Sequence, residues 1–218
     1  MTSPARKIGF LTWSGLALIV ATLLLVVLPA LVRLREHTES QLPTLGTVAN
    51  FTLTNQDGRA ITLTDLKGKV WVADIIFTRC AGPCLKMTRQ MRELQQALPA
   101  DSPVQLITLS TDPNFDQPAV LKTFAGRFGA DHRNWQFLTG SSMDMFRLAT
   151  ESLKLTALPK PPENRETPQD LFVHSTLFVI VDKNAHLRAA FETSGDGIDP
   201  HNIQKQILDA VDRLERER

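Results

Sequence analysis

The pattern of apolar and polar positions divides the chain into an uncharged stretch, a polar stretch and a folded part. Residues 8–32 carry no charged side chain, and about 25 residues of helix rise roughly 37 Å, enough to cross a bilayer. Residues 36–50 are polar and show no clear period, as linkers do. We therefore expect a short cytoplasmic tail and transmembrane anchor over 1–35, a linker over 36–50 and a folded domain over 51–218.

A cleavable signal peptide is the alternative to an anchor, but the apolar stretch is long and no clear small-x-small cleavage site follows it. Arg6 and Lys7 flank one side of the stretch and Arg33 and Arg35 flank the other, so the flanking charges do not decide its orientation. Export of a large C-terminal part is the commoner outcome for a signal anchor. We expect a single pass through a bacterial inner (cytoplasmic) membrane, with the domain facing the periplasm or the outside, an oxidising compartment.

Within the folded part, the period of the apolar positions alternates between that of strands and that of helices. Short alternating segments at 51–54 and 60–63, joined by a glycine-containing turn, predict an N-terminal β-hairpin. An apolar run over 70–77 is typical of a strand covered on both faces, and helical spacing over 83–98 follows it. A second apolar strand over 104–110 completes a parallel, right-handed βαβ unit.

The rest of the folded part predicts two helices around a short strand, a long loop, a hairpin and a last helix. Residues 154–170 contain four prolines and cannot be regular, and a loop of this length is usually functional or mobile. The remaining expected elements are helices at 118–128, 142–153 and 200–217 and strands at 135–138, 175–182 and 186–193. This order predicts an α/β, thioredoxin-like domain with an extra hairpin at its front and an inserted loop before its final hairpin.

Charge and cysteine content narrow the function classes. The 218-residue chain has 24 basic and 23 acidic residues, a formal net charge of +1. This balance gives no electrostatic basis for nucleic-acid binding, and we exclude that class. The chain has two cysteines, Cys80 and Cys84, and both lie at the predicted turn from the strand 70–77 into the helix 83–98.

Cys80 and Cys84 could form a structural disulfide, take part in redox chemistry or bind a metal. A bridge between them would close a loop of about five residues, for which chain entropy gives only about 2 kcal/mol of stabilisation. Pro83 suits the first helical position and Gly82 the cap before it, which places Cys84 in the first turn. The helix dipole and free N–H groups there favour a thiolate, either as a nucleophile or as a metal ligand. If the pair is redox-active, both cysteines are catalytic.

Two thiolates do not saturate most metals, so a third soft or borderline ligand is required. Of the five histidines, His174 is placed best, because it precedes the strand that a thioredoxin-like fold brings against the cysteine turn; a surface loop histidine is the alternative. Two Cys and one His suit Cu(I) and leave a zinc site one ligand short. Met87 and Met91 have the spacing of an apolar helix face, which favours core packing. The histidines interpreted as structural or surface residues are His37, His132, His186 and His201.

Two aspartates near the cysteine turn are further candidates. Asp74 lies in the apolar strand, six residues before Cys80. Burial there would raise its pKa enough for it to trade protons with a thiol, although a hydrogen-bonded structural aspartate explains it equally well. Asp112 follows the second strand, at the edge where open α/β sheets bind ligands, and turn formation before Pro113 is its alternative explanation.

Several motifs follow one another along the folded part. They are Gly68-Lys69-Val70-Trp71-Val72-Ala73-Asp74 leading into Phe77-Thr78-Arg79-Cys80, the Cys-x-x-x-Cys spacing, Ser110-Thr111-Asp112-Pro113 with Pro118 opening the next helix, Trp135-Gln136-Phe137-Leu138-Thr139-Gly140, and His174-Ser175-Thr176. In this order they resemble the SCO/SenC family, membrane-anchored thioredoxin-like proteins that deliver copper to cytochrome c oxidase. The resemblance implies metal ligands at Cys80, Cys84 and His174. It also implies a copper metallochaperone that carries Cu(I), with Cu(II) left open, to the copper-bearing subunit of cytochrome c oxidase or to another copper protein.

The cysteine turn departs from the family pattern. Many members have a proline after each cysteine, whereas Ala81 and Leu85 occupy those positions here and Pro83 precedes the second cysteine. The turn resembles the thioredoxin Cys-Gly-Pro-Cys turn with one residue inserted, and Asp74 stands at the spacing of the buried thioredoxin aspartate. A membrane-anchored thiol–disulfide oxidoreductase that reduces the acceptor's copper-ligand cysteines is therefore an alternative, and a copper or redox sensor is a third. Against the oxidoreductase, thioredoxins carry a cis-proline before the strand that faces the cysteines, whereas this chain has Val173-His174-Ser175-Thr176 there.

Overall fold

A computed structural model describes residues 20–30, 42–167 and 169–217 of the chain. The chain divides into two units, Met1–Gln41 and Leu42–Arg218. In the first unit, residues 20–30 are helical and include a π-helical stretch, η1 (Leu23–Val27). Most of the anchor expected over 8–32 lies outside the described residues. Among the described helices, none combines the length and the hydropathy that a bilayer span requires.

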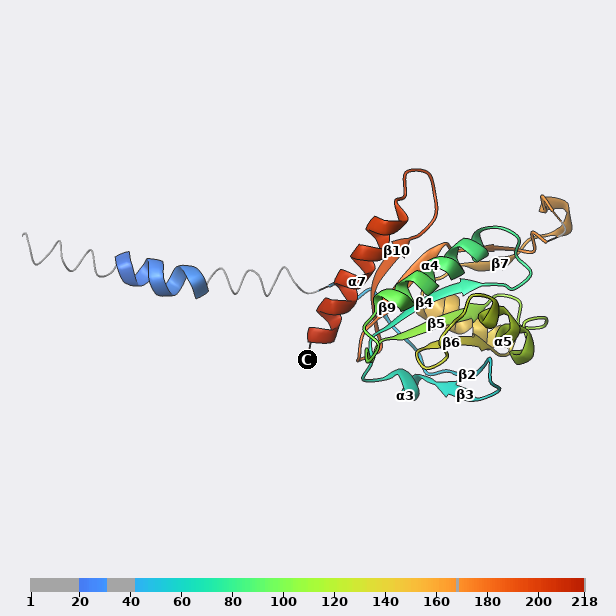
Figure 1. The fold of residues 1–218 in the computed structure, drawn as a ribbon, viewed down its shortest axis with the longest axis horizontal. Helices are drawn as coiled ribbons and strands as arrows, with labels where there is room; N and C mark the ends of the chain where they lie inside the picture. Colours follow the sequence, from blue (N-terminus) through green and yellow to red (C-terminus); the bar gives the residue numbers. More distant parts are fainter. Residues whose placement is uncertain (1–19, 31–41, 168, 218) are drawn as a thin grey trace, which may run out of the picture. The chain divides into compact units, whose positions relative to one another are not determined.

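An eight-stranded mixed sheet forms the centre of the second unit (Figure 1). In chain order its strands are β1 (Gly46–Thr47), β2 (Thr52–Asn55), β3 (Ala60–Thr62), β4 (Trp71–Ile76), β5 (Gln105–Ser110), β6 (Trp135–Thr139), β9 (Leu177–Val181) and β10 (His186–Glu192). In space the order is β1-β10-β9-β4-β5-β6-β2-β3. The pairs β4–β5 and β5–β6 are parallel and the others are antiparallel. The expected hairpin, βαβ unit and thioredoxin-like order are confirmed.

Helices cover both faces of this sheet. They are α3 (Leu63–Leu66), α4 (Pro83–Ala97), α5 (Pro118–Arg127), α6 (Ser142–Phe146), which continues into the π-helical η2 (Arg147–Ser152), and α7 (Pro200–Arg216). Side chains of α4, α5 and α7 share one core cluster, and those of α3, α6 and η2 share the other. Figure 1 shows α4 and α7 on the same side of the sheet. Every residue of β4 is buried between the two layers, as its apolar run predicted.

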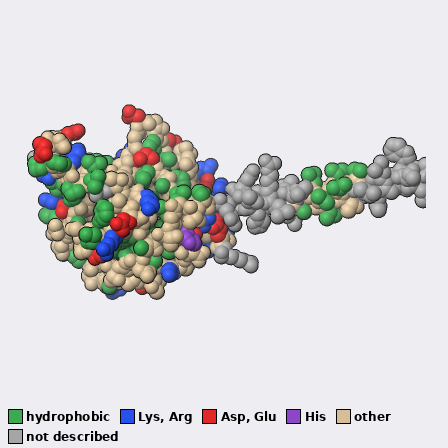
Figure 2. All heavy atoms as spheres, turned by 180° about the vertical axis from the view of Figure 1, so that it is seen from behind, with side chains coloured by type: hydrophobic (Ala, Val, Ile, Leu, Met, Phe, Trp, Pro, Cys, Tyr) green, Lys and Arg blue, Asp and Glu red, His purple; other side chains and the backbone are tan. Residues whose placement is uncertain are grey.

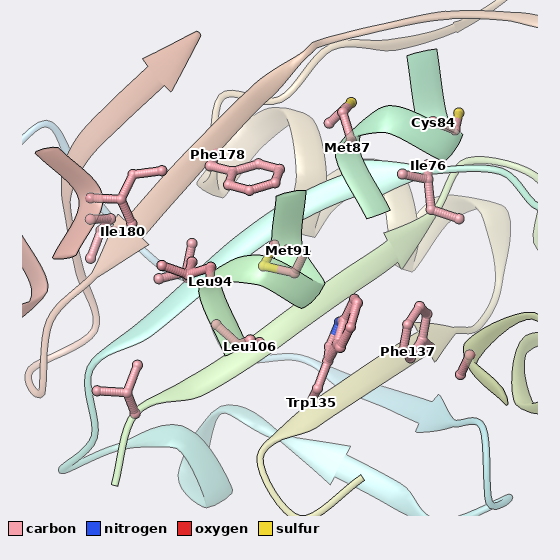
Figure 3. Packing of buried hydrophobic residues seen from close by; sticks show 14 of the residues in the cluster. Ile76, Cys84, Met87, Met91, Leu94, Leu106, Trp135, Phe137, Phe178 and Ile180 are labelled. Atoms are coloured by element: carbon pink, nitrogen blue, oxygen red, sulfur yellow. The ribbon is translucent and has the colours of Figure 1, made fainter. Parts of the chain in front are cut away.

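The helix α4 is anchored by its apolar face (Figure 3). Met87, Met91 and Leu94 recur at three- and four-residue steps, and each is at most 1 % exposed. Burial of such a side chain contributes about 1.5–3 kcal/mol, so these three contacts fix the helix firmly against the sheet. The prediction that the two methionines fill the core is confirmed. This packing holds the first turn of α4, and with it Cys84, in place.

The prediction that residues 154–170 are entirely irregular is wrong. Three of them form the strand β7 (Ala157–Pro159), which pairs antiparallel with β8 (Phe172–His174) in a separate two-stranded ribbon. A short 3₁₀ helix, η3 (Pro162–Asn164), lies between them. Prolines are compatible with this ribbon because both of its strands are edge strands, where a missing N–H removes no obligatory ladder bond. The ribbon delivers His174 to the cysteine turn.

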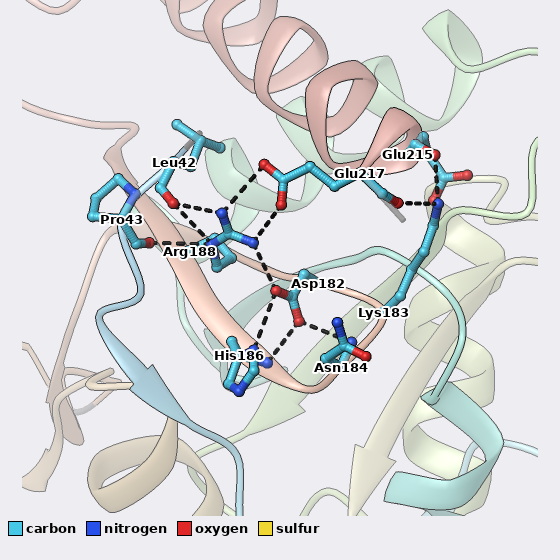
Figure 4. A network of polar contacts seen from close by, with 9 residues as sticks. All are labelled: Leu42, Pro43, Asp182, Lys183, Asn184, His186, Arg188, Glu215 and Glu217. Atoms are coloured by element: carbon cyan, nitrogen blue, oxygen red, sulfur yellow. Dashed lines mark hydrogen bonds and ion pairs between the residues drawn. The ribbon is translucent and has the colours of Figure 1, made fainter. Parts of the chain in front are cut away.

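The folded part begins earlier than the sequence indicated. Strand β1 lies within the segment expected to be a linker, and it pairs with β10. Arg188 on β10 donates hydrogen bonds to the carbonyl oxygens of Leu42 and Pro43 and forms ion pairs with Asp182 and Glu217 (Figure 4). These contacts join residues far apart in the chain, so they leave no periodic signal in the polar segment itself.

Candidate metal centre

The cysteine turn connects the carboxyl end of β4 to the amino end of α4. Beyond Ile76 the backbone N–H of Cys80 donates to the carbonyl oxygen of Phe77 at 3.2 Å. Gly82 is the N-cap of α4 and Pro83 its first residue, as expected. Cys84 therefore occupies the first helical turn, and its side chain points into the core cluster beneath α4. The two thiols thus differ sharply in environment: Cys84 is fully buried, while Cys80 borders a cleft.

His174 comes from the last position of β8. Its Nδ1 lies 3.0 Å from the carbonyl oxygen of Ser175. A carbonyl oxygen only accepts, so Nδ1 carries the proton and Nε2 of the neutral ring keeps its lone pair. That Nε2 lies 3.1 Å from Sγ of Cys84. The backbone carbonyl directly after β8 therefore sets the tautomer that a metal ligand requires.

The structure brings the three predicted ligands together. The Sγ atoms of Cys80 and Cys84 and a ring nitrogen of His174 all lie within 4.8 Å of one another. The ring of Phe77 braces the group, with its centroid 5.8 Å from the His174 ring and 5.2 Å from that of Phe172, both edge to face. A cleft of about 280 Å³ opens beside Cys80 and His174 and is walled on one side by the η3–β8 segment. Cys84 is not on the lining of this cleft.

The pKa values of the two thiols are shifted in opposite directions. The neighbouring Cys84 thiol, the His174 ring and the Gly82 N–H stabilise a thiolate on Cys80 and lower its pKa to about 4. Burial, followed by the adjacent Cys80 sulfur, raises the pKa of Cys84. The reduced pair therefore shares one proton, which stays on Cys84. Such a pair offers one anionic sulfur at the edge of the cleft and one fully buried sulfur that becomes available only when its proton leaves.

Asp74 lies beneath the site on β4 and is fully buried. Neither of its carboxylate oxygens has a hydrogen-bond partner among the described residues. Burial raises its pKa to about 7, although the proximity of Thr108 and of His174 opposes the rise. A carboxyl group with this pKa can gain or lose a proton near neutral pH, as the proton-exchanging interpretation requires. Asp74 is not part of the Cys80–Cys84–His174 group.

Asp112 does not reach the metal group. Its carboxylate accepts a hydrogen bond from Nε of Arg79 at 3.2 Å and forms an ion pair with the same guanidinium. It thereby ties the loop after β5 to the cysteine turn. The other histidines of the described residues also lie elsewhere: His132 is near Asp57, His186 is near Asp182, and His201 is exposed at the start of α7. His37 lies outside the described residues.

Asp116 is a positioning residue that the sequence did not single out. It is fully buried and accepts from the backbone N–H of Thr78 at 3.1 Å, from the Thr78 hydroxyl, and from the hydroxyl of Ser110 at 2.6 Å. Burial raises its pKa. Asp116 fixes the backbone two residues before Cys80 from a loop 38 residues further along the chain. Asp116 lies four residues after Asp112 in a sequence typical of a polar turn, so no local pattern distinguished it as a buried residue.

The family model of SCO1/SenC proteins matches residues 39–211. The chain belongs to the SCO1/SenC family. That match spans β1 to most of α7 and includes all three residues of the metal group. The resemblance inferred from the motif order is therefore confirmed over nearly the whole second unit.

Individual SCO1/SenC relatives agree with this assignment. An SCO1 protein homolog of Bacillus subtilis is 41 % identical over 136 residues, which cover 62 % of this chain and 67 % of the relative. A candidate copper-binding protein of Stutzerimonas stutzeri is 30 % identical over 175 residues, or 77 % of this chain and 80 % of the relative.

Solved structures share the fold. An SCO1/SenC family lipoprotein from Bacillus anthracis superposes with a TM-score of 0.65 at 31 % identity, covering 80 % of this chain and 98 % of that one. BsSco, a member of the Sco family of cytochrome c oxidase assembly proteins with a disulfide switch, gives a TM-score of 0.64 at 32 % identity and covers 78 % and 98 %. The α/β thioredoxin-like architecture is thus common to this chain and to solved members of its family.

Proposed function

We propose that the protein is a copper metallochaperone whose cargo is Cu(I), held by Sγ of Cys80, Sγ of Cys84 and Nε2 of His174. The observation that carries this proposal is the convergence of these three donor atoms within 4.8 Å, with the histidine tautomer set by Ser175. Two thiolates and one imidazole form a soft set of low coordination number, which suits Cu(I). The copper-binding name of the Stutzerimonas stutzeri relative supports the same cargo.

The two cysteines take different parts in loading and delivery. Cys80 is already an anion at the edge of the cleft, so it is the first protein sulfur that an incoming ion meets. Cys84 must lose its proton to become a ligand, which makes binding release a proton. On delivery, an acceptor ligand reaches the ion from the cleft and displaces Cys80 first, because Cys84 and its helix turn are buried behind it.

The acceptor that we propose is the copper-bearing subunit of cytochrome c oxidase, since BsSco belongs to a family of oxidase assembly proteins. We further propose that residues 1–35 anchor the chain in a bacterial inner membrane, with 36–41 as the tether and the domain on the outer side. The lipoprotein relative from Bacillus anthracis supports membrane attachment. A periplasmic reporter fused after Arg218 should be active, and activity of a cytoplasmic reporter at that position instead would reject this topology.

The central test is a titration of the reduced full chain with Cu(I) against a strong competing chelator. We expect 1:1 binding that His174→Ala weakens by at least about tenfold, since even second-shell losses at metal sites cost 10–100-fold. His201→Ala is the matched control, because His201 is exposed on α7 and distant from the cysteine turn in the chain. Weak binding that His174→Ala leaves unchanged would remove the metallochaperone proposal.

The second candidate is a thiol–disulfide oxidoreductase, which the lowered pKa of Cys80 beside the protonated Cys84 favours. The Cys80 thiolate would attack an acceptor disulfide, forming a mixed disulfide and releasing one acceptor thiolate. Deprotonated Cys84 would then attack Sγ of Cys80, closing the Cys80–Cys84 disulfide and releasing the second acceptor thiolate, with two electrons passing to the acceptor. Cys84→Ser should trap the mixed disulfide, whereas Cys80→Ser should form none.

A further inference from the structure

A groove of about 480 Å³ lies on the α5 side of the cysteine turn, separate from the cleft beside Cys80 and His174. Arg79 and Thr78 of the turn form one wall, and residues of α5 form the other. Phe115 and Val120 supply apolar surface, and Phe115 is 43 % exposed. Arg79 is the residue directly before Cys80, so the groove begins one residue from the thiolate that borders the cleft.

The groove is cationic. Arg79 and Arg127 line it, and no carboxylate does so among the described residues. Arg79 stacks on the ring of Phe115, with its guanidinium carbon 4.2 Å from the ring centroid. Arg127 is exposed and forms no ion pair or side-chain hydrogen bond with any described residue. On the face of the molecule that Figure 2 shows, cationic and acidic side chains are interspersed, and the whole chain has a net charge of only +1. This groove therefore differs from the general surface, because the charged side chains that line it are all cationic.

We propose that this groove docks the copper acceptor through a segment in which an apolar side chain is flanked by carboxylates. The proposal rests on the copper-delivery function above. Ligand exchange requires the acceptor's donor atom to reach the ion beside Cys80, so the acceptor surface must also cover the adjoining Arg79 and Phe115. The apolar wall receives the apolar side chain, and guanidinium groups pair with carboxylates in a planar, bidentate geometry.

Charge complementarity at this position would act mainly on the rate of encounter. A cationic groove beside a reactive sulfur attracts an acidic segment and orients it over the site, which raises association rates by about 10-fold or more at low ionic strength. Arg79 is already paired with Asp112, so its charge is partly offset. Arg127 keeps its full charge available and is the residue whose reversal should matter most.

The test uses two synthetic acceptor peptides that share a Cys-x-x-x-Cys segment and differ in the flanking sequence, Glu-Phe-Glu in one and Lys-Phe-Lys in the other. Transfer of Cu(I) from the loaded full chain is followed by stopped flow. The acidic peptide should receive the ion about tenfold faster at low salt, and this advantage should vanish in high salt. It should also be lost in Arg127→Glu and in Thr123→Glu, which places an acid on the exposed α5 wall of the groove.

Lys205→Glu is the matched control, because Lys205 is exposed on α7, which packs near β9 and β10 rather than near α5. It makes the same charge change and should keep the tenfold preference. Equal rates for the two peptides, or the same loss in Lys205→Glu as in Arg127→Glu, would overturn the docking proposal while Cu(I) binding stands. If the wild-type chain binds no Cu(I), the delivery function itself fails. Fluorescence anisotropy of the labelled acidic peptide then still tests the groove, and unchanged binding in Arg127→Glu would overturn it.

Discussion

Replacing Asp74 by Asn should make the protein more stable at neutral pH, although it alters a fully buried residue. Asp74 lies in the middle of β4 with no hydrogen-bond partner for either carboxylate oxygen among the described residues. Burial therefore disfavours its charged form and raises its pKa from 3.8 to about 7. Asparagine has nearly the same shape and carries no charge. Because the amide and the protonated acid both bury unpaired polar atoms, that cost nearly cancels between the two proteins.

The magnitude follows from the difference between the folded and unfolded pKa values of Asp74. A folded-state pKa of about 7 against 3.8 in the unfolded chain, at 1.36 kcal/mol per pKa unit, gives about 4 kcal/mol. Well below pH 4 the acid is protonated in both states and costs nothing, and at pH 4 the cost is still small. Between pH 4 and pH 7 the folded state binds one more proton than the unfolded state, so stability falls by about 1.4 kcal/mol per pH unit. Above pH 7 the full cost applies, so Asp74→Asn should match wild type at pH 4 and exceed it by up to about 4 kcal/mol at pH 8.

The assay is urea denaturation of the reduced full-length protein and of the variant at half-unit steps from pH 4 to pH 8.5. The relevant quantity is the difference in unfolding free energy between the two proteins, because the titration of other groups largely cancels in it. Asp209→Asn is the control, because it removes an exposed acid from α7. Its difference in unfolding free energy from wild type should not grow between pH 4 and pH 7. A stability difference for Asp74→Asn that stays constant from pH 5 to pH 8 would refute the reasoning, as would a variant less stable than wild type at pH 8.

Three further outcomes are expected. Iodoacetamide should modify Cys80 at a nearly constant rate from pH 5.5 to pH 8, since its pKa is about 4, and should spare the buried Cys84; peptide mass spectrometry checks both. Phe77→Leu should lower the Cu(I) affinity measured by chelator competition, because the Phe77 ring packs against the His174 ring and holds the proposed ligand in place, and unchanged affinity would contradict this role of Phe77. Arg188→Met should cost about 3 kcal/mol of unfolding free energy in urea, since it removes the guanidinium that pairs with the buried Asp182, whereas Arg133→Met, at an exposed pair, should change little.

The sequence predicted the elements whose signals are local. The period of Met87, Met91 and Leu94 marked α4 and its buried face, and Pro83 marked its start. The run before Cys80, apolar except for Asp74, marked a strand covered on both sides, because only a strand in the middle of a layered sheet buries every residue. The predicted element boundaries were wrong where an element depends on contacts with residues far away in the chain. Strand β1 depends on pairing with β10 and on Arg188, and neither leaves a trace in the polar segment that precedes residue 51.

The two-stranded ribbon of β7 and β8 is a second case in which the sequence pattern did not determine the structure. The four prolines over 154–170 led to the expectation of no regular structure, but they do not exclude a short 3₁₀ helix or an isolated ribbon, whose two edge strands tolerate missing N–H groups. The ribbon sets the position of His174, so its misassignment concerned the element that carries the third member of the Cys80–Cys84–His174 group.

His174 was nevertheless identified, because its chemistry and its place before β9 sufficed without knowledge of β8. What the sequence could not predict was the protonation state of Cys80, Cys84 and His174. The tautomer of His174 depends on the carbonyl oxygen of Ser175, and the division of one proton between Cys80 and Cys84 depends on their unequal burial. Residue types and spacing determine which atoms can meet. Burial and hydrogen bonds, which arise only from the folded chain, determine which of those atoms is charged, which is protonated and which faces an incoming partner.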